Sequence, residues 1–167
     1  MDHRLASALL LFGFFAPPAL AADLPARAPG LWQSTTTALG ADGQPLPNAE
    51  NVISVSCVDP LNDEKFFLSE SAACTGLTIS GSGGTYNIDA TCRHNGVARP
   101  LHETLTYQDA KNVAFKAAFN TDQGQITITS QLQWQGACLP GMLPGDEGNI
   151  VNGSFSKADN INDPANQ

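Results

Sequence analysis

The stretch QITITSQLQWQGAC, residues 125–138, alternates between apolar and neutral polar side chains. Residues two apart lie on the same face of a β-strand, so this alternation predicts a strand with one buried face. The apolar parity consists of Ile126, Ile128, Ser130, Leu132, Trp134 and finally Cys138. We therefore expect a sheet built around this strand, with the sulfur of Cys138 in the same layer as Trp134.

Other segments repeat the strand pattern on both sides of this stretch. Thr-rich residues 31–39 are followed by residues 52–58, where Ile53, Val55 and Cys57 share the parity that we expect to face inward. From residue 77 onward, alternating segments are separated by Gly- and Asn-rich turns. These segments predict an all-β, antiparallel meander of about seven to eight strands that forms a curled sheet, a barrel or a sandwich.

One short segment departs from the strand pattern. Asp59 can accept hydrogen bonds from free amide groups, and Pro60 suits the first helical position, so together they predict a short helix that reaches to about Ser71. An irregular loop is the alternative.

The two ends of the chain differ in composition from the middle. Residues 1–21 contain an apolar run, LASALLLFGFF, and then Ala19-Leu20-Ala21, which together predict a cleaved export signal. The run is shorter than the ~20 residues that span a bilayer. We expect residues 22–148 to form a single β domain. Residues 149–167 are polar and poor in large apolar groups, which predicts a disordered tail.

The formal net charge is −8, and lysine and arginine form no cluster. Nucleic acids and anionic lipids require concentrated positive charge, so the sequence argues against both as partners. The charge allows a cationic protein partner.

Four cysteines are present, Cys57, Cys74, Cys92 and Cys138, and none forms a C-x-x-C pair. An exported chain meets an oxidising compartment, so we expect two disulfides and no metal site. Sequence allows three connectivities. Chain order favours Cys57 with Cys74 and Cys92 with Cys138.

An ordered set of short motifs resembles a known family. Pro29-Gly30-Leu31-Trp32, the step Cys57-Val58-Asp59-Pro60, and residues 134–138, WQGAC, occur together with the other two cysteines. This set resembles the exported bacterial family named domain of unknown function 3617, over roughly residues 28–138. The resemblance implies an all-β domain in the periplasm of a Gram-negative bacterium, and it implies no particular activity. Secretion from the cell is the alternative location that the export signal allows.

The sequence offers no catalytic constellation, and we expect no cofactor. Outside the expected signal the only histidines are His94 and His102, and neither has a nucleophile in a recognisable setting. Adjacent carboxylates such as Asp146-Glu147 rarely converge on one substrate, so structural or solvated roles are expected for them. We therefore predict a non-catalytic binding or interaction domain.

Two more specific functions are alternatives. Ser82-Gly83-Gly84-Thr85-Tyr86 matches S-G-x-x-Y and resembles a loop motif of lysozyme inhibitors, which indicates an acidic inhibitor of a basic cell-wall hydrolase. The other alternative is a carrier of a small lipophilic molecule, for which Phe115 and Trp134 are candidate pocket residues. Small inward residues such as Ala117 and Ser130 favour a filled core over a pocket, because they let opposing walls meet.

Overall fold

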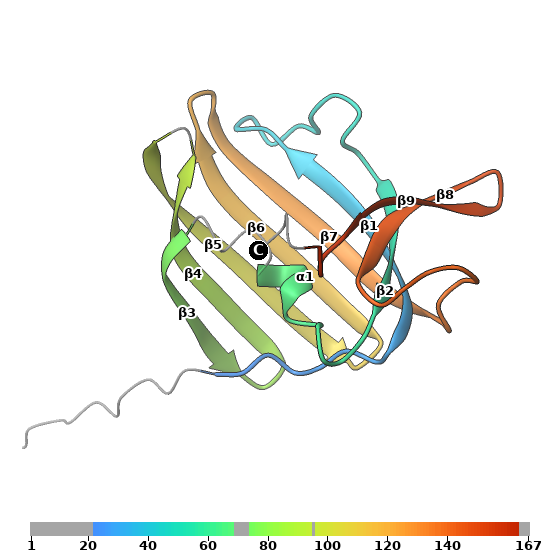
Figure 1. Ribbon diagram of the computed structural model, residues 1–167. Helices are drawn as coiled ribbons and strands as arrows, with labels where there is room; N and C mark the ends of the chain where they lie inside the picture. The colour runs from blue at the N-terminus through green and yellow to red at the C-terminus, as the bar shows by residue number, and fades with distance from the viewer. Residues whose placement is uncertain (1–21, 69–73, 95, 164–167) are drawn as a thin grey trace, which may run out of the picture.

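The computed structural model describes residues 22–68, 74–94 and 96–163; the expected signal peptide lies outside these residues. Within them the chain forms nine β-strands and one helical turn (Figure 1). The elements are β1 (Gly30–Leu39), β2 (Val52–Val58), α1 (Lys65–Leu68), β3 (Cys74–Ser82), β4 (Thr85–His94), β5 (Val97–Asp109), β6 (Asn112–Thr121), β7 (Gly124–Gly136), β8 (Asp146–Val151) and β9 (Ser154–Asn160).

All nine strands belong to one antiparallel sheet with the order β3-β4-β5-β6-β7-β1-β2-β8-β9. Strands β3 to β7 form a meander, and β1 then pairs with β7, so that Ser34 lies opposite Leu132 and Thr36 opposite Ser130. The sheet curls strongly, and α1 lies within its concave side (Figure 1). This arrangement confirms the predicted all-β fold, and of the three predicted forms it is the curled sheet.

The core fills only part of the concave side. Its most buried members are Leu24, Trp32, Val58, Ile88, Leu105 and Val113. Phe66, Phe67 and Leu68 of α1 pack against this cluster, and the ring of Phe67 stacks on that of Phe115 with centroids 6.4 Å apart. The helical turn therefore covers one part of the concave side, and the rest of that side is not filled by the core.

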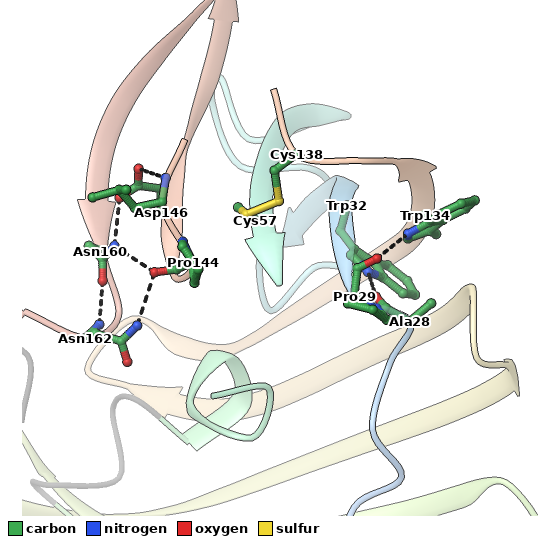
Figure 2. The surroundings of a disulfide bond; sticks show 11 residues. Ala28, Pro29, Trp32, Cys57, Trp134, Cys138, Pro144, Asp146, Asn160 and Asn162 are labelled. Carbon is green, nitrogen blue, oxygen red and sulfur yellow. Dashed lines mark hydrogen bonds between the residues drawn. A yellow bond between two sulfur atoms is a disulfide. The ribbon is translucent and has the colours of Figure 1, made fainter. Parts of the chain in front are cut away.

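Gly30 and Gly136 explain why glycine stands in the P-G-L-W and W-Q-G motifs. Both have positive φ, 127° and 122°. A Cβ atom on Gly30 would lie 2.1 Å from the carbonyl oxygen of Gly136, so only glycine lets the two strands approach here. The close approach allows Trp134 Nε1 to donate to the Pro29 carbonyl oxygen at 3.0 Å, beside the bond from Trp32 Nε1 to Ala28 (Figure 2).

The disulfides confirm that all four cysteines are bridged but correct the expected connectivity. The bonds are Cys57–Cys138 and Cys74–Cys92. Cys74 and Cys92 lie directly opposite each other on β3 and β4. Leu31 of β1 lies opposite both Cys57 and Gly136, so the end of β7 is near Cys57 although it is distant in sequence. Chain order failed because pairing in the sheet, and not sequence separation, sets which cysteines meet.

The inward parity expected for β2 is also wrong. Ser56 lies opposite Trp32 and faces the concave side, whereas Val55 and Cys57 face the convex side. Val55 and Cys57 are nevertheless buried, while Ile53 is 55% exposed. Cys138 reaches Cys57 on this convex side, so its sulfur does not share the layer of Trp32 and Trp134 (Figure 2).

Most of the expected disordered tail is ordered. Residues 146–151 and 154–160 form the β8–β9 hairpin, and Ile161 is buried. Polar groups replace apolar burial here. The buried Asp146 carboxylate accepts hydrogen bonds from Leu143 N and Asn160 Nδ2, and Asn160 and Asn162 both donate to Pro144 O (Figure 2). Residues 164–167 of the expected tail lie outside the described residues.

The predicted helix is shorter than expected. Asp59 accepts a hydrogen bond from Leu61 N at 2.9 Å, as a capping residue does, but the next residues form turns and α1 begins only at Lys65. Residues 69–73, which include the expected helix end, lie outside the described residues.

Candidate ligand-binding cavity

A cavity of about 290 Å³ occupies the part of the concave side that the core leaves open. Strands β1, β2 and β5 to β8, the helical turn and the segment before β1 all contribute to its walls. The lining residues are Arg27, Trp32, Ser34, Ser54, Ser56, Phe66, Phe67, Leu101, Glu103, Phe115, Ala117, Phe119, Ile128, Ser130, Leu132 and Glu147.

The wall formed by β5, β6 and β7 is mainly apolar. Ala117 lies opposite both Glu103 and Ile128, and Phe119 lies opposite Leu101. Because Ala117 is small, it leaves the space between its larger neighbours open. Ala117, which was expected to let opposing walls of the interior meet, therefore contributes to the open space of the cavity instead.

The facing wall, formed by β1, β2 and β8, is polar. Ser34 and Ser54 share a hydrogen bond of 2.7 Å, and Ser56 lies between Trp32 and Glu147 in neighbouring strands. Neutral hydroxyl groups can donate or accept, so this wall can adapt to a polar group of either kind. The cavity is thus amphipathic from one side to the other.

Arg27 lines the cavity and is almost fully buried, with 2% of its surface exposed. Its Nε donates to Asp63 Oδ1 and its backbone N to Asp63 Oδ2, both at 2.7 Å. The guanidinium also lies over the rings of Trp32, Phe66 and Phe67, with distances of 4.6–5.2 Å. Among the described residues Arg27 Nη2 has no hydrogen-bond partner, which leaves a buried charged donor unsatisfied.

Glu147 places a carboxyl group on the polar wall. Burial raises its pKa, the Asp159 charge raises it further, and the nearby Arg27 lowers it less than these two effects raise it. Its neighbour Asp146 behaves oppositely. Burial would raise the pKa of Asp146, but hydrogen bonds from Leu143 N, Lys157 and Asn160 hold it below its usual value.

The structure separates the residues that the sequence proposed as ligand contacts. Phe115 lines the cavity. Trp134 does not line the cavity. Lys111 Nζ lies over its ring, 4.1 Å from the ring centroid. Tyr86 packs edge-on against Tyr107 in the filled part of the concave side, while Ser82 and Gly83 lie in the exposed β3–β4 turn.

His102 lies outside the cavity. His102 Nδ1 is 2.5 Å from Asp89 Oδ1 on the exposed convex side. Among the described residues no group of three or more His, Cys, Asp or Glu side chains is placed to hold a metal ion. No helix within residues 22–68, 74–94 and 96–163 has the length and apolar character needed to cross a membrane.

Sequence reasoning missed the polar part of the site. Ser54 and Ser56 alternate with Ile53, Val55 and Cys57, so apolarity assigned the wrong face of β2 to the interior. Arg27 carried one usable signal, because it is an isolated cation in an otherwise apolar stretch just before the P-G-L-W motif. Its partner Asp63 could not be inferred from spacing.

The family named "Protein of unknown function (DUF3617)" matches residues 27–138, which is more than half of the chain. The chain belongs to the DUF3617 family. No curated protein and no solved structure matches it.

The part matched to DUF3617 begins at Arg27 and ends at Cys138. It includes both disulfides, the Arg27–Asp63 pair and every cavity-lining residue except Glu147. The β8–β9 hairpin, which supplies Glu147, lies beyond the match. The two disulfides indicate that this DUF3617 protein folds in an oxidising environment outside the cytoplasm.

Proposed function

We propose that this DUF3617 protein is a non-catalytic periplasmic binding domain that holds a small, mainly apolar molecule in the concave cavity. The observation that carries the proposal is the cavity itself, about 290 Å³ in volume and walled by Leu101, Phe115, Phe119, Ile128 and Leu132 on its apolar side. Small-molecule sites are concave, largely apolar and oriented by a few polar groups. This cavity has that composition.

The volume limits the size of the ligand. An engineered apolar cavity of ~150 Å³ binds benzene, so this volume suits a molecule of roughly a dozen non-hydrogen atoms. Such a ligand would bury apolar surface worth about 25 cal/mol per Å², which supplies the main driving force for binding.

Replacement of Ala117 by phenylalanine tests the proposal. Ala117 lines the cavity and is buried, whereas Ala118 next to it points to the convex side and lies opposite His102 and Thr127. Ala118→Phe is therefore a matched control that adds the same volume on the other face. We expect Ala117→Phe to weaken binding of 1-decanol by at least about tenfold, because the ring occupies the cavity, and Ala118→Phe to leave binding unchanged.

Fluorescence gives a direct readout. The chain has two tryptophans, and Trp134→Phe leaves Trp32, which lines the cavity, as the only reporter. Native mass spectrometry of protein isolated from the periplasm should also show a small adduct that Ala117→Phe lacks. If 1-decanol binds neither variant nor parent, or binds all of them equally, the cavity is not a binding site.

Inhibition of a basic cell-wall hydrolase stays an untested hypothesis. Tyr86, the last residue of the motif, packs edge-on against Tyr107 and against the core cluster, which gives this hypothesis no support. A lysozyme assay with micromolar protein tests it, and an absence of inhibition would remove it.

A further inference from the structure

The lining of the cavity is rich in aromatic rings. Five of its residues are aromatic, namely Trp32, Phe66, Phe67, Phe115 and Phe119, whereas aromatic residues make up 7% of the whole chain. Aromatic rings pair with other rings in offset-stacked or edge-to-face arrangements, and such pairs contribute more than the burial of apolar area alone. The kind of apolar molecule that fits best therefore depends on which of these rings has room for a further partner.

Most of the five rings already have partners within the protein. The Arg27 guanidinium lies over Trp32 and over both phenylalanines of α1, and these three residues belong to the core cluster or pack against it. Phe67 also stacks on Phe115, which uses one face of the Phe115 ring. Phe119 differs, because it is not part of the core cluster and pairs with no other ring in the part of the chain that the structure describes.

The spacing along β6 leaves a place for one more ring. Phe115, Ala117 and Phe119 occupy alternate positions of β6, and all three line the cavity. A strand rises about 3.4 Å per residue, so each phenylalanine position lies about 6.8 Å from Ala117 along the strand. Aromatic pairs are favourable at centroid separations of about 4.5–7 Å. A flat ring above Ala117 is thus within pairing distance of both phenylalanines.

The residues around Ala117 and the size of the cavity agree with this placement. The Ala117 side chain ends at Cβ, and Ile128, its partner on β7, adds an apolar contact on the same wall. A cavity of ~150 Å³ holds one benzene ring, so about 290 Å³ has room for two fused rings.

On the basis of the function proposed above, we propose that the cavity is selective for flat two-ring aromatic molecules, with one ring above Ala117 between Phe115 and Phe119. The aromatic ring of the ligand then completes a row of three rings along β6. A saturated ring system of the same skeleton is puckered and has no π face, so it gains only the burial of apolar area.

Two compounds that differ only in aromaticity test this selection. 2-Naphthol and its fully saturated analogue 2-decalol have the same carbon skeleton and the same hydroxyl group, and both are uncharged at pH 7. The saturated compound is no less apolar, so area burial alone predicts equal or tighter binding of 2-decalol. Two additional ring pairs predict the reverse, and we expect isothermal titration calorimetry to show about tenfold tighter binding of 2-naphthol.

A variant that removes one ring adds a second readout. Phe119→Leu keeps an apolar side chain but loses the π face, so the preference for 2-naphthol should fall from about tenfold to about threefold. Phe155→Leu makes the same chemical change on β9, at a residue that does not line the cavity, and should leave the preference unchanged.

The parent protein, labelled at alanine methyl groups, reports where the ring lies. The ring current of an aromatic ligand shields nuclei above and below its face. 2-Naphthol should therefore shift the Ala117 methyl signal upfield, and 2-decalol should not. Ala118, which lies on the convex side opposite His102 and Thr127, is the internal control and should not respond to either compound.

The outcomes separate the two proposals. Equal affinities, tighter binding of 2-decalol, or binding of 1-decanol without binding of 2-naphthol would overturn the selection for aromatic rings and leave the binding function standing. A preference that survives unchanged in Phe119→Leu, or an Ala117 methyl signal that does not move, would overturn the placement of the ring between the two phenylalanines. Failure of 2-naphthol, 2-decalol and 1-decanol to bind would overturn the binding function itself.

Discussion

Arg27 is the residue on which the arrangement of the cavity depends most. Its buried ion pair with Asp63 joins the segment before β1 to the turn before α1, and three aromatic rings surround its guanidinium. Removal of one partner of a buried pair leaves the other charge unpaired in a poorly hydrated site. The anchor for the N-terminal segment would be lost at the same time.

We predict that Arg27→Met lowers the free energy of unfolding by about 3–5 kcal/mol. Arg99→Met is the control, because its partner Asp122 has 92% of its side chain exposed, and pairs of this kind contribute less than about 1 kcal/mol. Urea unfolding followed by circular dichroism measures both. Similar losses for the two variants would contradict the role given to the Arg27–Asp63 pair.

Glu147 makes a prediction about pH. Its pKa is raised by burial in the folded protein, so the folded state binds more protons than the unfolded state once the pH passes the ordinary value of 4.5. The stability contributed by this group therefore falls as pH rises from about 4.5 through the folded pKa. Glu147→Gln removes this loss. We therefore expect the free energy of unfolding of the variant, relative to that of the parent, to increase between about pH 4.5 and pH 7.

Asp146, the residue before Glu147, is a control for which the expected change of stability with pH has the opposite sign. The pKa of Asp146 is lowered, so its contribution is present above the unfolded pKa and disappears as pH falls through the folded one. Asp146→Asn should thus be less stable than the parent at pH 7, and the difference should shrink in acid. Urea unfolding across pH measures both variants, and a constant difference for Glu147→Gln would contradict the account.

At the scale of elements, the two disulfides differ in what they connect. Cys57–Cys138 ties β2 to the chain beyond β7 across 81 residues, whereas Cys74–Cys92 joins two paired strands across 18 residues. A crosslink that closes a longer loop removes more entropy from the unfolded chain. The first bond should therefore stabilise the fold more.

We predict that Cys57→Ala with Cys138→Ala costs about 4.5 kcal/mol, and that Cys74→Ala with Cys92→Ala costs about 3 kcal/mol. Chemical unfolding without reductant compares the two double variants. Peptide mapping of the unreduced parent checks the pairing. A Cys57–Cys74 peptide, or a larger loss from the second double variant, would count against the assigned connectivity.

Elements were predictable from sequence where local chemistry decides them. The alternation in residues 125–136 predicted β7, and the bounds of β2 agree with the segment expected there. The β8–β9 hairpin was missed although Asn152 and Gly153 both have positive φ, as the Asn-Gly dipeptide of a tight hairpin requires. Low apolar content was misleading because hydrogen bonds from Asn160 and Asn162 order this region.

The interior was harder to predict for a physical reason. Parity arguments assume that the inner face is apolar, but the β2 face of this cavity carries Ser54 and Ser56. Under the same assumption, Ala117 and Ser130 were predicted to let opposing walls meet in a filled core, but both residues line the cavity. Phe115 lies on the concave side, where an aromatic side chain in an apolar alternation is expected whether the interior is filled or open.

On the scale of the whole molecule, the sheet order explains the cavity. The meander β3 to β7 supplies the apolar wall, and β1, β2 and β8 continue the same curled sheet to place the polar wall across from it (Figure 1). The helical turn α1 and the segment before β1 fill the remaining part. The sheet thus brings together side chains from Arg27 to Glu147 around one space.

The most direct test of this account is a methyl NMR titration of the protein, labelled at isoleucine and leucine, with 1-decanol. Ile128, Leu101 and Leu132 line the cavity, while Ile53 and Ile150 are exposed and lie outside it. The account predicts that the methyl signals of the first three residues shift and show intermolecular NOEs to the decyl chain, with no change at the other two residues. Shifts confined to Ile53 and Ile150, or no shifts at any of the five, would contradict it.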